Sequence, residues 1–331
     1  MKGTQCALRI LLVAVIGMAL FCPAKSQVRV DSKLPEYSPV SGVSGSLKSV
    51  GSDTMNNLMA LWGEKFIQIY PNVTVEVEGK GSSTAPPALI SGTATFGPMS
   101  RPMKEKEVEA FQERFGYKPS CLRTGIDMLA VYVHKDNPIA KKGFTLSQVD
   151  AIFSKTRKGG HEEIVTWGQV GLEGEWADKP ISLYGRNSAS GTYGYFKKHA
   201  LFDGDYKDSV KEQPGSASVV QGVASDKYAI GYSGIGYKTA DVAVVPLAAD
   251  DESVYLPPSY DHVADYPLAR FLLVYVNHKP GQDLDPLRKE FLKLVFSRQG
   301  QEMVIKDGYL PVTNTIAMKD LQSLGIELKS L

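Results

Sequence analysis

Three short segments rich in Gly, Ser and Thr each stand directly before a helical pattern, at residues 51–54, 81–84 and 185–192. A helix N-terminus carries about half a positive charge, and its first backbone N–H groups have no partner within the helix. Together with nearby hydroxyls, these donors can bind a tetrahedral oxyanion. Ser and Thr are also preferred helix caps, so each segment alone could be only a cap. The same chemistry at three junctions favours an anion site.

Two arginines accompany these segments. Arg186 lies inside the third one, and Arg101 follows the stretch "FGPMS". A guanidinium is a planar fork of donors that suits phosphate or carboxylate. Arg101 has the alternative of being an exposed charge at the end of a strand. Arg186 is therefore the stronger candidate for an anion ligand.

Other kinds of site have weaker support. The five His are scattered, and no pair has the spacing of zinc ligands. "EGKGSS" departs from a Walker loop because Gly81 separates Lys80 from Ser82, and no G-x-S-x-G nucleophile elbow occurs. Cys121 could be a nucleophile, although a buried structural thiol explains it more simply. We therefore expect no metal, no cofactor and no covalent catalysis.

The elements that must position these residues alternate between strands and helices. A helical apolar face follows the first segment, formed by Met55, Leu58, Met59, Trp62, Phe66 and Ile69. Strands are expected over 73–79, 93–100, 126–134, 181–185, 228–236, 243–248 and 266–277. Helices are expected over 104–115, 145–154, 191–201 and 216–225, with two more in 285–311. Thr145 is expected to start the helix over 145–154. This alternation predicts an α/β fold with buried sheets.

The two long apolar strands, 126–134 and 266–277, are candidate crossovers between two lobes. One lobe would then contain both ends of the chain, and the other its middle. We expect lobe I at 47–130 plus 270–331 and lobe II at 131–269. The length of 331 residues is enough for two such domains, at about 150 residues each.

The first 26 residues are typical of a secretory signal peptide. Lys2 and Arg9 give a basic start, residues 10–21 are apolar, and "AKS" at 24–26 is a small-residue cleavage site. Attachment of a lipid to Cys22 is the alternative, which the bulky Phe21 disfavours. No later segment is long and apolar enough to span a membrane. We therefore expect a periplasmic protein, with an extracellular location as the alternative.

Cleavage after Ser26 would change the charge and the cysteine content of the chain. It removes three basic residues and no acidic one, which takes the formal charge from +1 to −2. A nearly neutral chain argues against a nucleic-acid partner, which requires a basic field. Cys121 would be the only cysteine left, so no internal disulfide is expected. Residues 27–46, rich in Ser, Pro and Gly, are expected to form an extended arm or a disordered leader.

Over residues 47–311 the sequence resembles the PstS family of periplasmic phosphate-binding proteins, and most closely its pseudomonad-type branch. The resemblance rests on the combination "VGSDTMNNLMALW", "GSSTAPPALISGT", "GPMSRPM", "HKDNPI", "GRNSASGTYGYF", "EQPGSASVVQ", "GYSGIGYKTA" and "YPLARFLLVYVN". It implies a two-lobed type II periplasmic-binding-protein fold. Each lobe would be a mixed sheet flanked by helices, with phosphate in the cleft between the lobes.

The resemblance also implies a set of ligands. Thr54 and the Met55 amide would bind phosphate at the first helix, and Ser82 at the second junction. The other lobe would contribute Arg186 and the S-G-T turn, which is Ser190, Gly191 and Thr192 here. Arg101 adds a further candidate cation.

Two positions depart from the family pattern. Ser100 stands where the family usually has an Asp that accepts a proton from phosphate, and Ser188 where an Asp usually pairs with the site arginine. A hydroxyl does not repel sulfate as a carboxylate does. Asp53 is the candidate replacement acceptor, with capping of the helix that starts at Thr54 as its alternative role.

The function implied is capture of inorganic phosphate in the periplasm and delivery to the membrane permease of an ABC transporter, by a monomer. One alternative is a receptor for another tetrahedral oxyanion, such as sulfate or arsenate. Another is a secreted phosphatase or an adhesive protein on the same scaffold. Neither affinity nor selectivity follows from the sequence.

Overall fold

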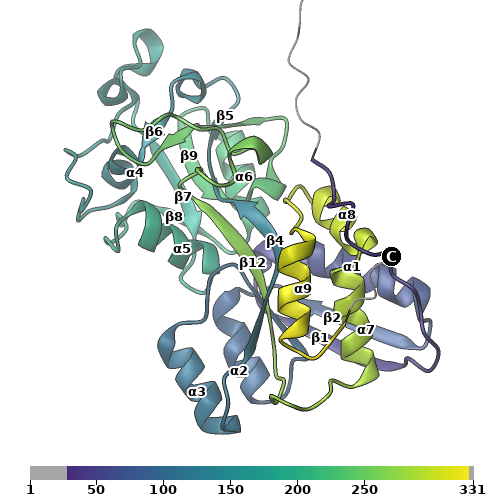
Figure 1. Cartoon of the computed structure of the whole chain (residues 1–331). Helices are drawn as coiled ribbons and strands as arrows, with labels where there is room; N and C mark the ends of the chain where they lie inside the picture. The colour runs from purple at the N-terminus through teal and green to yellow at the C-terminus, as the bar shows by residue number, and fades with distance from the viewer. Residues whose placement is uncertain (1–27, 328–331) are drawn as a thin grey trace, which may run out of the picture.

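The computed structural model describes residues 28–327. The predicted signal peptide, with Cys6 and Cys22, lies outside the described residues. Two five-stranded mixed sheets, each covered by helices on both faces, make up two lobes (Figure 1). This confirms the predicted α/β class and the division into two sheets.

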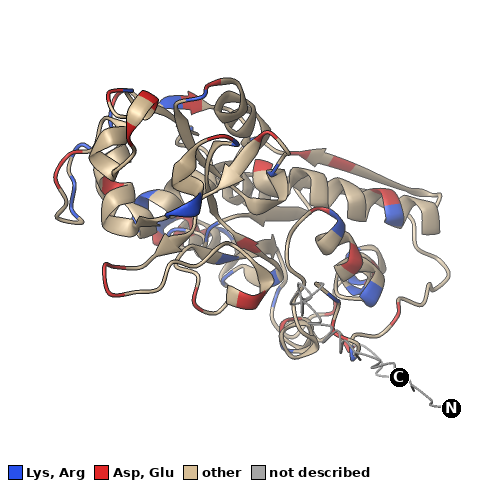
Figure 2. Cartoon of the chain, turned by 90° about the horizontal axis from the view of Figure 1, so that it is seen from above, with Lys and Arg blue, Asp and Glu red and all other residues tan. Residues whose placement is uncertain are grey.

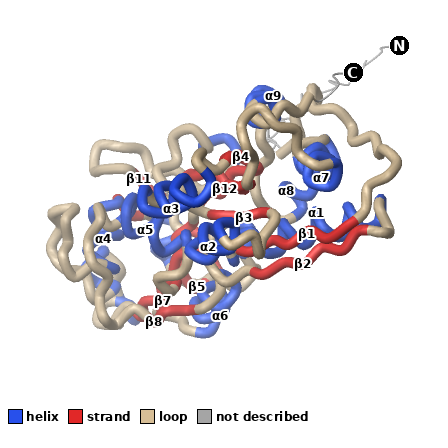
Figure 3. The backbone as a smooth tube through the Cα atoms, turned by 90° about the horizontal axis from the view of Figure 1, so that it is seen from below, coloured by secondary structure: helices blue, strands red, loops and turns tan. Residues whose placement is uncertain are grey.

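The sheet of lobe I has the strand order β2-β1-β3-β12-β4. Its strands are β1 (Gly45–Val50), β2 (Val73–Glu78), β3 (Phe96–Met99), β4 (Ser120–Met128) and β12 (Ala269–Val276). β1 is parallel to β2 and β3, which lie beside it in Figure 3, whereas β12 is antiparallel to β3 and β4. Because β1, β2 and β3 run the same way, their carboxyl ends meet at one edge, next to the lobe II strands.

Two cores sandwich this sheet, because successive side chains of a strand face opposite sides. Along β12, Leu272 and Val274 enter one core, and Leu273 and Tyr275 the other. The first core is closed by α1 (Asn56–Ile69), α7 (Pro286–Val295), α8 (Arg298–Lys306) and α9 (Asn314–Gln322). The second is closed by α2 (Ala85–Ile90) and α3 (Glu105–Phe115). The yellow C-terminal helices lie beside the purple and blue N-terminal strands in Figure 1, so lobe I contains the first and the last elements of the described residues.

The sheet of lobe II has the order β10-β5-β9-β7-β8. Its strands are β5 (Ala130–His134), β7 (Ser182–Arg186), β8 (Lys211–Gln213), β9 (Ala229–Ser233) and β10 (Val242–Val244), and β6 (Phe144–Thr145) pairs separately with β11 (Leu247–Ala248). Helices α4 (Leu146–Phe153) and α5 (Gly191–Ala200) cover one face, and α6 (Ser216–Ser225) the other. As predicted, Thr145 caps α4 by accepting a hydrogen bond from the Gln148 amide.

Short 3-10 turns complete the description. Two of them stand at the predicted junctions, η1 (Asp53–Met55) and η2 (Ser82–Thr84). The others are η3 (Pro138–Lys141), η4 (Trp167–Val170), η5 (Gly174–Trp176), η6 (Ile235–Tyr237) and η7 (Tyr260–His262). In the described part of the chain, no helix has the length and apolarity needed to cross a membrane. Basic and acidic residues are interspersed along both lobes (Figure 2), in line with the near-neutral charge.

The prediction of one continuous strand over 126–134 is wrong. β4 ends at Met128 in the sheet of lobe I, and β5 begins at Ala130 in that of lobe II. The Leu129 amide between them donates to the carbonyl of Leu268, just before β12, at 3.1 Å. The two crossings are therefore adjacent. An unbroken apolar run cannot reveal where a strand changes its partner, and the expected lobe boundaries stay a prediction.

The arm is packed against lobe I over its described part, so the disordered-leader alternative is wrong there. Leu34 is fully buried and Val43 nearly so. The Tyr37 hydroxyl bonds to the Tyr70 hydroxyl at 2.5 Å and to Glu290 at 2.9 Å. Regular structure begins at Gly45, two residues before the expected start of lobe I at residue 47.

Candidate functional site

The carboxyl ends of β1, β2 and β3 bring the first two junctions together. The Gly51 amide donates to Glu78 on β2 at 2.9 Å, and the Ser52 amide donates to Pro98 on β3 at 2.8 Å. The Gly81 amide then donates to Gly51 at 2.8 Å. These backbone bonds fix η1 and η2 side by side at the sheet edge.

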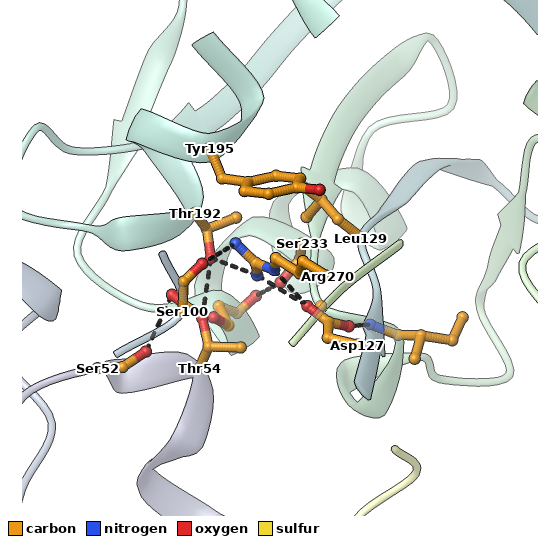
Figure 4. A network of polar contacts seen from close by, with 12 residues as sticks. Ser52, Thr54, Ser100, Asp127, Leu129, Thr192, Tyr195, Ser233 and Arg270 are labelled. Carbon is orange, nitrogen blue, oxygen red and sulfur yellow. Dashed lines mark hydrogen bonds and ion pairs between the residues drawn. The ribbon is translucent and has the colours of Figure 1, made fainter. Parts of the chain in front are cut away.

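Five buried hydroxyls gather at this point, from Ser52, Thr54, Ser82, Ser100 and Thr192, and we call them the hydroxyl cluster. The Ser82 oxygen accepts from the Ser100 amide at 3.0 Å, and Ser52 donates to Ser100 at 3.1 Å. The hydroxyl oxygens of Thr54 and Thr192 are 2.9 Å apart (Figure 4). Thr54 belongs to lobe I and Thr192 to lobe II, so the cluster spans the cleft.

The third junction completes the cluster from lobe II. Ser190 caps α5, because its hydroxyl accepts from the amides of Thr192 at 3.1 Å and Tyr193 at 3.4 Å. Gly191 lies against lobe I so closely that an added Cβ would be 2.2 Å from the Ser82 oxygen and 2.7 Å from that of Ser100. The two lobes can therefore approach each other at Gly191 because this residue has no side chain.

Arg186 is buried at the end of β7. Its Nη1 lies 3.0 Å from Asp53 Oδ2 and 2.6 Å from the Ser216 hydroxyl, and its Nη2 donates to the carbonyl of Pro214 at 3.0 Å. Its Nε is buried and has no partner within residues 28–327. Burial lowers the pKa of Arg186, and the Asp53 carboxylate opposes that effect. An anion would gain both a buried donor and a positive charge here.

Asp53 joins the two lobes. Besides its pair with Arg186, its Oδ2 accepts from the Ser216 amide, at the start of α6, at 2.7 Å. Within residues 28–327 its side chain accepts from the Ser216 amide and from no amide of its own turn, whose cap position is Ser52, so the predicted alternative of Asp53 as a cap is wrong. Asp53 is the carboxylate partner of Arg186. It takes the role of the Asp that the family usually has at the position of Ser188. The sequence contained both residues but gave no sign that they pair.

Sequence reasoning missed a second buried arginine, Arg270, and its partner Asp127. Their side chains are 2% and 0% exposed. Arg270 donates to Asp127 Oδ2 from Nε at 3.0 Å and from Nη2 at 2.7 Å. The same Nη2 reaches the Thr192 hydroxyl at 2.9 Å, and Nη1 reaches the carbonyl of Ser100 at 2.8 Å (Figure 4). One charged residue inside each long apolar strand was the signal available in the sequence.

Two predicted ligands are engaged elsewhere. Arg101 donates from both Nη atoms to the carboxylate of Glu107 on α3, at 2.8 and 2.7 Å. This ion pair occupies the fork of donors that an anion would need, and we leave Arg101 out of the site. The Met55 amide donates to the carbonyl of Ser52 at 3.2 Å, and its side chain is buried in the core. An anion would have to share that amide.

The arrangement can bind an anion by hydrogen bonds and charge. It offers hydroxyls from both lobes, the positive ends of helix starts and two arginines, each with one carboxylate partner. In the described part of the chain, no His is hydrogen-bonded to a hydroxyl of the cluster.

Comparisons with known proteins agree with this architecture. The family model of the PBP superfamily domain matches residues 38–299. The phosphate-binding protein PstS of Pseudomonas aeruginosa is 52% identical, over 96% of this chain and 99% of that protein. The protein of the same name from Staphylococcus haemolyticus is 29% identical, over 78% of each chain.

Solved structures resemble the fold. A putative phosphate ABC transporter substrate-binding protein from Clostridium perfringens, with bound phosphate, superposes with a TM-score of 0.66 at 23% identity. It covers 81% of this chain and 100% of that one. An ABC-type phosphate transport receptor from Vibrio cholerae gives 0.61 at 23% identity, with 80% and 100% covered.

Proposed function

The chain belongs to the PBP superfamily and, within it, to the PstS family of phosphate-binding proteins, and from this premise we propose that it binds inorganic phosphate in the cleft between its lobes. It delivers the anion to the membrane permease of an ABC transporter. It functions in the periplasm, and the predicted signal peptide supports this location. It acts as a monomer and as a binding protein without covalent chemistry.

The observation that carries the proposal is the convergence of hydroxyls from both lobes on one buried point. A phosphate that leaves water loses its hydration shell, so donors of the protein must replace it. Thr54, Ser82 and Ser100 approach from lobe I, and Gly191 and Thr192 from lobe II. Only a closed cleft brings both sets within reach of one anion.

We propose the following ligand set: Asp53, Thr54, Met55 (amide), Ser82, Ser100, Arg186, Ser190 (hydroxyl), Gly191 (amide) and Thr192. Arg186 supplies positive charge and its buried Nε donor. Asp53 holds Arg186 in place and offers a carboxylate oxygen to a protonated phosphate. Sulfate at neutral pH carries no proton, so the same carboxylate disfavours it.

A second candidate is a receptor for a different oxyanion, and Ser100 is the observation that favours it. A carboxylate at this position would repel an unprotonated anion, whereas the Ser100 hydroxyl accepts from Ser52 and can donate. Sulfate would then be bound with an affinity comparable to that for phosphate.

Calorimetric titration of the protein purified from periplasm separates these functions. We expect tight binding of phosphate, much weaker binding of sulfate, and no turnover of a phosphate ester such as p-nitrophenyl phosphate. Equal affinities would favour the general oxyanion receptor. Absence of phosphate binding, or hydrolysis of the ester, would overturn the proposal.

A further inference from the structure

We propose that Arg270, oriented by Asp127, is a second cationic residue of the anion site and that its bond to the oxygen of Thr192 directs the hydrogen of that hydroxyl toward the anion, or toward Thr54, which then donates to the anion. This inference rests on the proposed function, because it concerns the same site. Arg270 contributes charge directly, and Asp127 is a positioning residue that acts through it.

The first argument is the location of the pair. Asp127 on β4 lies opposite Arg270 on β12 in the sheet register, next to the points where the chain passes between the lobes. From there the guanidinium reaches the Ser100 carbonyl of lobe I and the Thr192 hydroxyl of lobe II. Thr192 is itself 2.9 Å from the hydroxyl of Thr54. An anion bound by these two hydroxyls would be a direct neighbour of Arg270.

The second argument follows from counting hydrogens. A guanidinium only donates, so the oxygen of Thr192 accepts from Arg270 at 2.9 Å. The single hydrogen of that hydroxyl must then point away from Arg270. Its other hydrogen-bond partner is the hydroxyl of Thr54, on the opposite side of the cleft. The anion therefore receives the Thr192 hydrogen directly, or receives that of Thr54 when Thr192 donates to Thr54.

The third argument concerns which hydrogen-bonding groups of Asp127 and Arg270 are already occupied. Asp127 uses both oxygens, Oδ2 for Arg270 and Oδ1 for the amide of Ile235 at 2.9 Å. Asp127 thus holds the orientation of the pair. Arg270 has five N–H groups, and bonds to Asp127, Ser100 and Thr192 occupy four of them. The fifth, on Nη1, has no partner within residues 28–327 and can donate to an anion.

Replacement of Arg270 tests the charge. Arg270→Met alone would leave Asp127 buried without its partner and could unfold the protein. The double variant Arg270→Met/Asp127→Asn removes both charges, and Asn can still accept from Ile235. We expect it to fold and to bind phosphate about 10- to 150-fold more weakly, as for loss of one bond between charged groups. Arg270→Lys keeps the charge but loses the fork, so its affinity should lie between those of the wild type and the double variant.

The double variant Arg123→Met/Asp320→Asn is the matched control. Arg123 also lies on β4 and also pairs with a carboxylate, that of Asp320, at 2.5 Å, but it makes no contact with the hydroxyl cluster. Its loss should leave phosphate affinity unchanged. Thermal unfolding of all variants, measured by circular dichroism, verifies that each is folded at the temperature of the calorimetric titration.

A double-mutant cycle with Thr192→Val tests the action through the hydroxyl. If Arg270 orients Thr192, Thr192→Val should weaken phosphate binding much less in the Arg270→Met/Asp127→Asn background than in the wild type. Equal losses in both backgrounds would refute the orientation of Thr192. Wild-type affinity in the folded double variant would refute the role of Arg270. A wild-type protein that binds no phosphate would instead refute the proposed function itself.

Discussion

Replacement of Gly191 by Ala should impair phosphate binding without harming the fold of either lobe. The new Cβ would be 2.2 Å from the hydroxyl of Ser82, whereas ordinary contacts begin at 3.4 Å, so the two must part by about 1.2 Å. Ser82 cannot easily yield, because it is fully buried and accepts from the Ser100 amide. The displacement therefore falls on the cleft between the lobes.

The size of the effect follows from the bonds that this opening breaks. The distance between the hydroxyls of Thr54 and Thr192, now 2.9 Å, would grow to about 4 Å, which is beyond hydrogen-bond range. A neutral hydrogen bond contributes about 0.5–1.5 kcal/mol and a bond to a charged group about 1.5–3 kcal/mol. Loss of one of each predicts about 2–4.5 kcal/mol, or roughly a 30- to 2000-fold weaker affinity.

Calorimetric titration with phosphate measures this loss, and Gly194→Ala in the same helix is the matched control. A Cβ at Gly194 would lie 3.5 Å from the nearest atom, Cδ of Arg101, which is ordinary contact. Ala is also the better helix former, so this variant should be at least as stable as the wild type and bind normally. Wild-type affinity in Gly191→Ala would refute the reasoning, since the lobes would then not close against this glycine.

Three further changes give expected outcomes. Arg186→Ala should weaken phosphate binding by roughly 10- to 150-fold in calorimetry, because one charge-assisted bond is lost. Asp53→Asn should lower the ratio of phosphate affinity to sulfate affinity more than Ser100→Ala does. Of these two side chains, Asp53 is the one whose carboxylate can accept a hydrogen bond from protonated phosphate and repel sulfate. Burial raises the pKa of Asp307 to about 7. The folded state therefore favours the protonated acid, and this contribution to stability is complete below pH 3.8 and is lost as the pH rises to about 7. Asp307→Asn should remove that decline and raise the free energy of unfolding at neutral pH by about 1–3 kcal/mol in urea titrations.

Each of these three predictions can be contradicted by a specific result. A folded Arg186→Ala protein with unchanged affinity would remove Arg186 from the site, and Arg186→Lys serves if the Ala variant unfolds. An Asp53→Asn protein that still prefers phosphate as strongly would limit Asp53 to joining the lobes. If the stability of the Asp307→Asn protein has the same pH dependence as that of the wild type, the pKa of Asp307 is not raised by the fold.

Local patterns in the sequence were sufficient for most helices and for the three junctions. The predicted helix 216–225 matches α6, and the predicted Thr145 cap holds α4. These features depend on hydrogen bonds and apolar spacing within a few residues, so the segment itself determines them. The two long apolar strands indicated two lobes, and the resemblance to one family supplied the set of ligands. The hydroxyls of Thr54, Ser82 and Thr192 do come together.

Prediction stopped at 311 and missed α9, and it joined β4 and β5 into one strand. Both errors have a physical cause. A short amphipathic helix is stabilised by the core that it covers, and the core is known only from the fold. A fully buried strand is apolar on both faces, so its sequence carries no mark of where it leaves one sheet for another.

The pairing of charges was decided by the tertiary structure alone. Arg101 and Arg186 were both candidate anion ligands in the sequence, yet Glu107 engages the first, and Asp53, 133 positions earlier in the chain, engages the second. Asp127 and Arg270, 143 positions apart, meet only because β4 and β12 are neighbours in one sheet. Sequence determines which charged groups exist and what local turn presents them. Which carboxylate neutralises which arginine depends on distances of a few ångströms between segments that only the completed fold brings together.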